Sequence, residues 1–238
     1  MNIITIENIC KNYKEKKALD NVCLQIKQGE LLGLLGVNGA GKTTLIQILC
    51  GLTKKSSGTV TIDTYDLDKD IDKIKKIVDI SPQETSIANN LTVKENLEFF
   101  NELYNNPPDF IQEIVETFHL NDVLNQRAKT LSGGYKRRLS IAVALISKPK
   151  ILFLDEPTLG LDVYSRRELW KIIERLRENV TIILTSHYLE EIERLCDRVA
   201  ILSNGKLLQV GTVAHIKQLT NAQTFEDAFI NLVELANE

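Results

Sequence analysis

Apolar residues recur along this chain in two patterns that together predict a layered α/β fold. Short, nearly continuous apolar runs, which are typical of strands buried on both faces of a sheet, occur at 31–35, 77–80, 151–154, 180–184 and 199–202. Segments with a helical spacing of apolar residues follow several of these runs, at 44–49, 135–146, 165–178 and 189–196. Strands that alternate with helices in this way indicate a mostly parallel sheet covered by helices.

The remaining segments add strands at the N-terminal side and helices in the middle and at the end. Polar and apolar residues alternate at 3–7 and 18–26, which predicts strands, and 58–62 predicts another. A short helix is predicted at 70–76. From 92 to 125 the spacing is helical but broken at 105–108, where consecutive prolines must end a helix. Residues 203–206 predict a hairpin turn, and 213–235 a helical tail.

Length and charge narrow the classes of function. The 238 residues can bury a full core, and 29 basic against 32 acidic residues give a formal net charge of −3. This balance argues against a nucleic-acid binder, which normally carries a basic face. The small basic clusters at 14–17, 54–55 and 136–138 are therefore interpreted as solvated surface.

Cysteine usage and hydropathy are typical of a cytosolic protein. Cys10, Cys23, Cys50 and Cys196 show no C-x-x-C spacing and no nearby paired histidines, so we expect reduced, half-buried thiols rather than metal ligands or disulfides. No apolar run approaches the roughly 20 residues that span a bilayer, and the N-terminus lacks the apolar core of a signal peptide. If the chain works at a membrane, we expect another chain to provide the span.

The segment 36–43, GVNGAGKT, carries the most specific chemistry. It fits the phosphate-binding pattern G-x-x-x-x-G-K-[ST] and lies between a predicted strand and a predicted helix. The glycines allow backbone N–H groups to turn toward phosphates, Lys42 can reach the outer phosphates, and the Thr43 hydroxyl can hold Mg²⁺. A glycine-rich strand-to-helix turn without a ligand is the alternative. The context favours binding of a nucleoside triphosphate.

Two consecutive acidic residues, Asp155 and Glu156, end the apolar run at 151–154. Ligands of open α/β sheets bind beyond the carboxyl ends of the strands, so we expect both carboxylates to face the phosphate-binding loop. Asp155 is suited to the Mg²⁺ shell and Glu156 to orienting or deprotonating the attacking water. The alternative is that the two acids only cap the next turn.

Residues 131–134, LSGG, precede the helix predicted at 135–146 and by themselves would be an ordinary helix start. In this context the accumulated motifs resemble those of the ATP-binding cassette (ABC) family of transporter ATPases. In the family's order, they are the Walker A motif at 36–43, the Q-loop glutamine Gln83, the signature motif at 131–134, Walker B at 151–156, the D-loop at 161–162 and the H-loop His187. Tyr13 lies where the family's adenine-stacking aromatic occurs, although taken alone it is equally an ordinary strand aromatic.

The resemblance implies a P-loop NTPase of the α/β class, with an antiparallel N-terminal β subdomain beside the mostly parallel sheet and an inserted α-helical subdomain. The whole chain, 1–238, would form one nucleotide-binding domain. Its catalytic core and β subdomain would occupy 1–83 and 131–212, the helical insertion 84–130, and a C-terminal helical tail 213–238.

The resemblance also implies ATP and Mg²⁺ as cofactors. Contacts to ATP would come from Tyr13, Gly36, Asn38, Gly39, Ala40, Gly41, Lys42, Thr43 and Thr44, and to the ATP of the opposite subunit from Ser132, Gly133 and Gly134. Mg²⁺ would be held by Thr43, Gln83 and Asp155. Hydrolysis would depend on Glu156, His187, Gln83 and Lys42. Without this context, His187 would be interpreted as a surface histidine.

Two protein partners, and no nucleic acid, are implied as well. Two cassettes would sandwich two ATP molecules, as a homodimer or a heterodimer. A polytopic membrane permease subunit would contact this chain between about residues 84 and 104, placing it as a peripheral subunit on the cytoplasmic face of the cell membrane. We expect Leu97, Phe99, Phe100 and Tyr104 to be exposed for this contact, although they could instead fill the core of the helical insertion.

Two departures from the family pattern occur. Tyr135 replaces the usual glutamine after the signature, and Val163 replaces the usual proline after the D-loop. Together with KRR at 136–138 and the tail segment 224–229, the sequence is similar to a branch that exports drugs, lipids, polysaccharides or peptides through a separate membrane subunit. The alternatives are an importer subunit, a soluble cassette ATPase that is not part of a transporter, and a regulatory cassette that binds ATP without hydrolysing it. Glu156 and His187 argue against the last.

Overall fold

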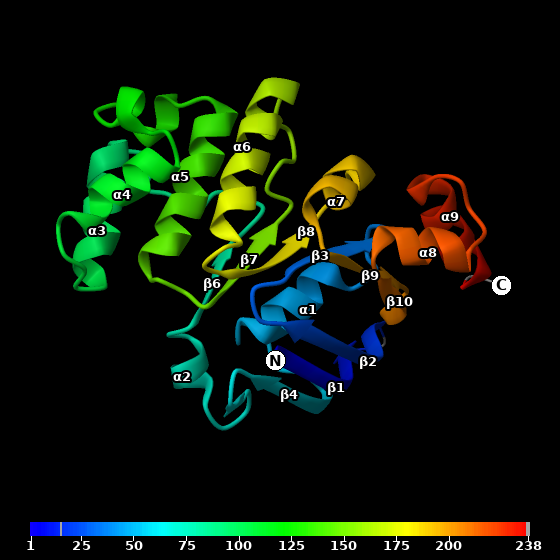
Figure 1. Ribbon diagram of the computed structural model, residues 1–238. Coiled ribbons are helices and arrows are strands. Elements are labelled where there is room, and N and C mark those ends of the chain that lie inside the picture. The colour runs from blue at the N-terminus through cyan, green and yellow to red at the C-terminus, as the bar shows by residue number, and fades with distance from the viewer. Residues whose placement is uncertain (15, 237–238) are drawn as a thin grey trace.

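The computed structural model describes residues 1–14 and 16–236, and within them the strands form two sheets (Figure 1). The first sheet is antiparallel, in the order β2-β1-β4-β5, and comprises β1 (Asn2–Tyr13), β2 (Lys16–Lys27), β4 (Ser57–Ile62) and β5 (Tyr65–Asp66). The second has the order β10-β9-β3-β8-β7-β6, with β3 (Leu31–Gly36), β6 (Val78–Ser81), β7 (Ile151–Asp155), β8 (Thr181–Thr185), β9 (Arg198–Ser203) and β10 (Lys206–Gly211). Only β10 runs antiparallel to its neighbour within this described sheet, so the predicted α/β class with a mostly parallel sheet is confirmed.

Alternate residues of the central strands pack into different cores, which explains why these strands are apolar throughout. Leu152 and Leu154 of β7 join the cluster that contains α5 (Gly133–Ile146) and α6 (Val163–Leu176). Ile151 and Phe153 join the cluster on the other face, which α1 (Lys42–Leu49) shares with the first sheet. The parallel sheet is therefore covered on both faces, with α1 between the two sheets (Figure 1).

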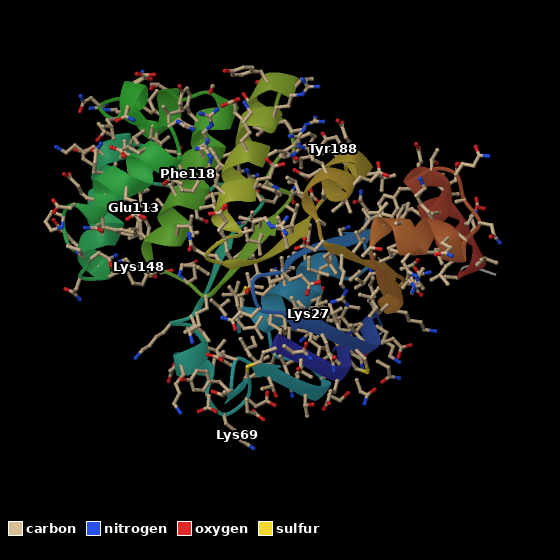
Figure 2. All side chains as sticks on the ribbon, in the orientation of Figure 1. Lys27, Lys69, Glu113, Phe118, Lys148 and Tyr188 are labelled. Atoms are coloured by element: carbon tan, nitrogen blue, oxygen red, sulfur yellow. The ribbon has the colours of Figure 1, made fainter. Side chains whose placement is uncertain are left out.

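The helical insertion begins with a well-defined cap and is broken by its prolines. Helix α3 (Val93–Leu103) starts at a capping box, in which the Thr92 hydroxyl accepts from the Glu95 N–H and the Glu95 carboxylate accepts from the Thr92 N–H. Helix α4 (Phe110–Thr117) follows the proline break, and short 3₁₀ turns, η1 (Asn121–Val123) and η2 (Ala128–Thr130), lead to α5. Phe118 is fully buried among these helices (Figure 2).

The helical tail predicted at 213–235 is two helices rather than one. Helix α8 (Val213–Leu219) and helix α9 (Phe225–Leu235) are separated by a turn, and each begins at a threonine cap, Thr212 and Thr224. The hairpin predicted at 203–206 is confirmed by the pairing of β9 with β10. The remaining helices, α2 (Ile71–Ile74) and α7 (Leu189–Leu195), are short.

Two expectations about exposure are wrong. The cluster at 136–138 is not solvated surface, because Arg137 and Arg138 are only 5% and 8% exposed. The thiols are not uniformly half-buried either, since Cys23 is exposed and Cys50 buried. The basic cluster at 14–17 and the tail to 238 include residues 15 and 237–238, which lie outside the described residues. Across the part of the chain that is described, no helix has the length and apolar character needed to cross a bilayer.

Candidate nucleotide-binding site

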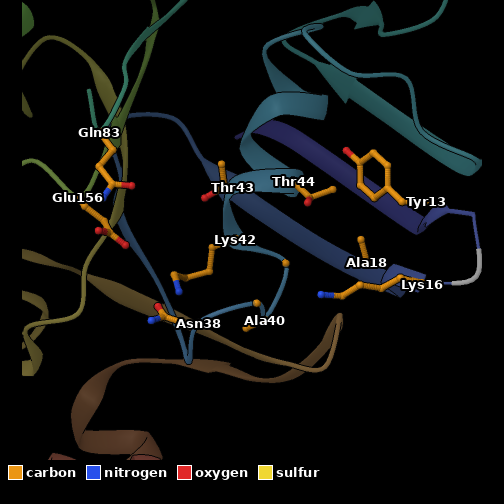
Figure 3. A pocket seen from close by; sticks show the side chains of 12 residues that line it. Tyr13, Lys16, Ala18, Asn38, Ala40, Lys42, Thr43, Thr44, Gln83 and Glu156 are labelled. Carbon is orange, nitrogen blue, oxygen red and sulfur yellow. The ribbon is translucent and has the colours of Figure 1, made fainter. Parts of the chain in front are cut away.

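A cavity of about 490 Å³ opens beside the loop that connects β3 to α1. It is lined by Tyr13, Lys16, Ala18, Asn38, Gly39, Ala40, Gly41, Lys42, Thr43, Thr44, Gln83 and Glu156. Figure 3 shows the loop between two sets of side chains, with Gln83 and Glu156 on one side and Tyr13 and Lys16 on the other. Most of the residues predicted from the sequence therefore surround a single cavity, although they come from segments far apart in the chain.

The loop adopts a backbone conformation that requires glycine. Gly41 has a φ of +108°, and a Cβ at this position would lie 2.7 Å from the carbonyl oxygen of Ala18. A Cβ on Gly36 would collide with the carbonyl oxygen of Leu202. The loop is therefore packed tightly against β2 and β9, which leaves its N–H groups, rather than side chains, at the cavity.

The start of α1 fits a bound phosphate. No side chain of the described residues caps this helix, and the first intrahelical bond runs from the Leu45 N–H to the Gly41 carbonyl at 2.9 Å. The N–H groups of residues 42–44 precede that bond and have no partner within the helix. Together with the positive end of the helix dipole, they form a site suited to an anion, and Lys42, Thr43 and Thr44 line the cavity at this place.

Lys42 supplies a cation at the same place. Its Nζ donates to the carbonyl oxygens of Gly36 at 2.7 Å and Val37 at 3.3 Å, and the residue is only 6% exposed. Burial lowers the pKa of Lys42, while the nearby carboxylates of Glu156 and Asp155 act in the opposite direction. A negatively charged phosphate in the cavity would add to the stabilisation of the charged form.

Asp155 is buried directly before the cavity residue Glu156, and it is held by a residue that the sequence did not single out. Thr185, at the end of β8, donates from Oγ1 to Asp155 Oδ1 at 2.6 Å. The same Oγ1 accepts the N–H of Glu156 at 2.8 Å. One hydroxyl thus fixes both acidic residues at the carboxyl end of β7. No signal within the apolar run at 180–184 distinguishes Thr185, because only the pairing of β7 with β8 brings it to these residues.

Glu156 and His187 form a pair at the mouth of the cavity. His187 Nε2 lies 2.5 Å from Glu156 Oε1, and the Glu156 side chain is 11% exposed. Glu156 also has a φ of +48°, an uncommon backbone conformation for a residue other than glycine. His187 does not itself line the cavity, so its contact with the site runs through Glu156.

The oxygen ligands present fit Mg²⁺ only together with a substrate phosphate. Among the described residues, no group of three or more His, Cys, Asp or Glu side chains could hold a metal alone. Mg²⁺ is usually bound through one or two carboxylates, with phosphates and water completing the octahedron. Thr43 and Gln83 line the cavity, and the buried Asp155 directly precedes Glu156, which also lines it. A hydroxyl, an amide and a carboxylate are a donor set of this kind.

Tyr13 and Lys16 form the far rim of the cavity, where β1 passes into β2. The Tyr13 ring is 44% exposed, and Lys11 Nζ lies 4.6 Å from its centroid. A half-exposed ring at this rim is available for stacking on a base. Lys16 was not predicted as a site residue, because in the sequence it is one of several lysines in a charged turn.

The residues of the signature motif lie away from this cavity. Ser132 is the N-cap of α5 and accepts from the Tyr135 N–H at 3.4 Å, while Ser132 and Gly133 are exposed. Gly134 has a packing reason to be glycine, because a Cβ would lie 2.7 Å from Ser165 Oγ. The Tyr135 ring is partly buried and stacks with the guanidinium of Arg138 at 5.2 Å. The exposed start of α5 therefore contributes nothing to the cavity of its own chain.

Arg137, which was predicted with Arg138 to be solvated surface, is held against the residues of this site. It donates to the carbonyl oxygens of Pro82 and Gln83, both at 2.7 Å, and faces the carbonyl of Glu156 at 3.4 Å. The local run of basic residues gave no indication of burial.

Comparisons with known proteins agree on the family. A model of the ABC transporter family matches residues 19–159. The linearmycin resistance ATP-binding protein LnrL of Bacillus subtilis is 39% identical over 215 residues, which cover 88% of this chain and 69% of that protein. ABC transporter A family member 7 of Dictyostelium discoideum is 44% identical over 221 residues, and there the match covers 90% of this chain but only 26% of the larger protein.

The fold is shared with a solved cassette. The dimeric post-hydrolysis state of the ATP-binding cassette MJ0796, bound to ADP and phosphate, has a TM-score of 0.78 at 26% identity, covering 88% of this chain and 98% of that one. Since a family model matches more than half of the chain and LnrL aligns over most of its own length, this chain belongs to the ABC transporter family and is one of its ATP-binding cassettes, an ABC-type ATPase.

Proposed function

We propose that this chain binds and hydrolyses ATP to drive export of a substrate through a separate membrane subunit. The observation that carries the proposal is the convergence of Lys42, Gln83 and Glu156 on one cavity, with His187 against Glu156. These groups supply a cation for phosphates, an amide for the metal and water, and a carboxylate next to a histidine. Their proximity supports the roles that the sequence assigns to these four residues.

Each group has a separate task in this proposal. The N–H groups of 42–44 and the Lys42 ammonium hold the β- and γ-phosphates. Thr43, Gln83 and Asp155 would hold Mg²⁺, which would neutralise phosphate charge. Glu156 orients or deprotonates the attacking water. His187 holds the Glu156 carboxylate through Nε2, and its donation to the γ-phosphate would require Nε2 to turn from Glu156 toward the cavity. Tyr13 stacks on adenine, which contributes about 1–3 kcal/mol by analogy with base stacking in nucleic-acid complexes.

A second cassette completes the site. Ser132 and Gly133 are exposed at the start of α5 and do not face the cavity of their own chain. A helix start of this kind is suited to the phosphates of a second ATP, held by a partner cassette. The dimeric arrangement of MJ0796 supports this assignment. Whether the partner is a second copy of this chain or a different cassette depends on the transporter.

A membrane permease is proposed to contact the region between the Gln83 loop and the helical insertion. A cavity of about 240 Å³ there is lined by Asp79, Ile80, Ser86, Phe100, Tyr104, Ser140, Val143 and Ala144. Phe99, Leu103 and Tyr104 are 57%, 61% and 47% exposed beside it. The expectation that Leu97 is exposed is wrong, because it is fully buried in the core of the insertion. The exposed aromatics of α3 and its end therefore support a docking surface.

The direction of transport is proposed from the relatives. One relative is named for linearmycin resistance, and another is the phospholipid-transporting ATPase ABCA3 of Homo sapiens. Resistance to a compound and transport of phospholipids both favour export, so we propose that this chain drives outward movement of a compound. The chain would then act at the cytoplasmic face of the membrane, while the permease selects the compound.

The proposal is tested in native membranes with two crosslinking variants, Phe99→Cys and Tyr104→Cys, in a chain whose exposed Cys23 is replaced by serine. We expect both to capture one polytopic membrane protein, whereas Glu226→Cys on the exposed face of α9 captures none. Inside-out vesicles containing the complex should accumulate substrate only with MgATP. Capture of soluble or ribosomal proteins alone would contradict a transport role, and accumulation in right-side-out vesicles would indicate an importer.

A further inference from the structure

The guanidinium of Arg137 joins three segments of the proposed site. Its Nη1 donates to the carbonyl of Pro82 at 2.7 Å and its Nη2 to the carbonyl of Gln83 at 2.7 Å. Nη2 also faces the carbonyl of Glu156 at 3.4 Å. All three acceptors are backbone oxygens, and they belong to the loop after β6 and the end of β7. Arg137 itself lies in the first turns of α5, directly after the signature motif.

Packing alone does not account for a charged residue at this place. Arg137 is 5% exposed, and burial of a guanidinium without a direct carboxylate partner is unfavourable. Burial lowers the pKa of Arg137, and the carboxylates of Asp155 and Glu156 oppose this effect at longer range. An apolar residue of similar length would fill the same space without the cost of desolvation. What such a residue could not do is hold carbonyl groups.

The planar, forked shape of the Arg137 guanidinium determines which groups it holds. A guanidinium presents its N–H groups in a rigid plane, so two consecutive carbonyls bound to it are fixed relative to each other. Holding Pro82 and Gln83 in this way fixes the backbone from which the Gln83 side chain enters the cavity. The backbone of Glu156 is held on both sides: its N–H donates to Thr185, and its carbonyl faces Arg137. Glu156 itself has a φ of +48°. Arg137 therefore helps to hold a backbone conformation that costs free energy.

We infer that Arg137 is a positioning residue for ATP hydrolysis, which couples the first turns of α5 to the Gln83 loop and the Glu156 backbone. The inference rests on the proposed function. Ser132 and Gly133 start the same helix and are proposed to contact the ATP of the partner cassette. A small displacement of α5 on contact with that ATP would therefore move Gln83 and Glu156, the two residues proposed to orient metal and water. The Arg137 side chain by itself connects α5 to both residues.

The first test compares Arg137→Met, which removes the charge at similar length, with Arg137→Lys, which keeps a charge but loses the fork. Arg167→Met, on the exposed face of α6, is the matched control. We expect kcat to fall by about 10- to 100-fold in Arg137→Met, as misplaced groups commonly cause. The Kd for ATP should change by less than about threefold, because Lys42 and its loop are untouched. Arg137→Lys should recover part of kcat, and Arg167→Met should match the unmodified chain.

The second test is a double-mutant cycle with Gln83→Ala. If Arg137 acts through the Gln83 loop, the two changes should be strongly non-additive, so that Arg137→Met costs less than about threefold in the Gln83→Ala chain. Fully multiplicative losses, or a kcat in Arg137→Met within about twofold of the unmodified chain, would overturn the inference.

Hydrogen exchange in the nucleotide-free chain gives a readout that does not depend on activity. We expect the amides of residues 83–86 to exchange at least about tenfold faster in Arg137→Met than in Arg167→Met, because local opening of the loop becomes easier. Unchanged exchange at 83–86, or faster exchange throughout the chain together with a lower melting temperature, would contradict a specific positioning role. An unmodified complex that hydrolyses no ATP would instead overturn the proposed function, while the exchange comparison would still decide whether Arg137 holds the loop.

Discussion

His187 and Glu156 meet across the ends of neighbouring strands, with the imidazole Nε2 2.5 Å from the carboxylate Oε1. Glu156 follows β7 and His187 follows β8, which pair in parallel, so the sheet brings to one edge two residues that are distant in the sequence. The contact restricts the Glu156 carboxylate to one orientation at the cavity. It makes the orientation of the proposed base dependent on the histidine.

The first prediction follows from this pair. Glu156→Gln keeps the shape of the side chain but removes the carboxylate that acts on water, so hydrolysis should slow by at least about 100-fold while ATP remains bound. Steady-state ATPase rates and nucleotide retention after gel filtration measure the two effects, and ATP should shift the variant to a dimer. Glu178→Gln, at an exposed residue just after α6, serves as the control. Normal turnover in Glu156→Gln would exclude Glu156 as the base.

The second prediction concerns the hydroxyl that holds both acidic residues. Thr185→Val is nearly isosteric but loses the bond to Asp155 and leaves the Glu156 N–H without its acceptor. An unpaired buried group costs about 1–3 kcal/mol. We expect roughly tenfold lower kcat and a higher Mg²⁺ concentration for half-maximal activity.

The matched control for this prediction lies at the other end of the same strand. Thr181 Oγ1 accepts the Gly29 N–H at 2.9 Å and is likewise buried, so Thr181→Val also removes one hydrogen bond. It should lower the free energy of unfolding by a similar amount without changing kcat or the Mg²⁺ requirement. Equal kinetics for the two valine variants would show that Thr185 has only a structural role.

The third prediction separates nucleotide binding from stability at Lys42. Lys42→Met removes the ammonium that would contact the phosphates and should weaken ATP binding by about 100-fold or more, as expected for the loss of charge-assisted hydrogen bonds. The nucleotide-free chain should be no less stable at pH 7. Burial lowers the pKa of Lys42, so folding disfavours its charged form. At pH 7 the charged ammonium therefore makes the nucleotide-free fold less stable. The free energy of unfolding rises only when the pH rises toward the ordinary pKa of 10.5, because the folded chain then loses this proton first. Calorimetric titration with ATP and thermal melting check the two parts; tight binding by Lys42→Met would refute the assignment of the loop.

The fourth prediction uses the single tryptophan as a reporter of a buried acid. Trp170 Nε1 donates to Glu191 Oε1 at 2.7 Å, and Glu191 is fully buried. Burial raises the pKa of Glu191, although the nearby polar side chains of Ser186, Trp170 and Thr158 oppose the shift. For a raised carboxyl pKa, the stabilising contribution is complete below the ordinary value of 4.5 and is lost as pH rises through the folded-state pKa.

Glu191→Gln should therefore gain stability relative to the unmodified chain as pH is raised from about 4.5 to 8. Urea unfolding followed by Trp170 fluorescence measures the difference. Glu190→Gln, the exposed neighbour on α7, should show no such pH dependence. A constant difference between Glu191→Gln and the unmodified chain at all pH values would mean that Glu191 keeps one protonation state throughout this range.

Local sequence patterns were sufficient to predict those parts of the fold and site that depend only on residues close together in the chain. The phosphate-binding loop needs glycine at the positive φ of Gly41 and a lysine at the start of the helix, and these residues are contiguous. The apolar run at 151–154 predicts a buried strand because both faces of β7 are covered. The tail was predicted as helical, but not its break, where Asn221 has a positive φ and Thr224 caps a new helix.

The sequence by itself determined the family, the α/β class, the loop around Lys42 and the identity of the acidic pair at 155–156, because each depends on residue types at short fixed spacings. Only the tertiary structure decided that Arg137 is buried against two loops, that Thr185 holds Asp155, and that Leu97 is core while Phe99 is exposed. Burial and hydrogen bonding depend on which segments pack together. A run of charges, a hydroxyl after an apolar strand, or an apolar residue on a helix has the same local pattern whether it faces solvent or another segment.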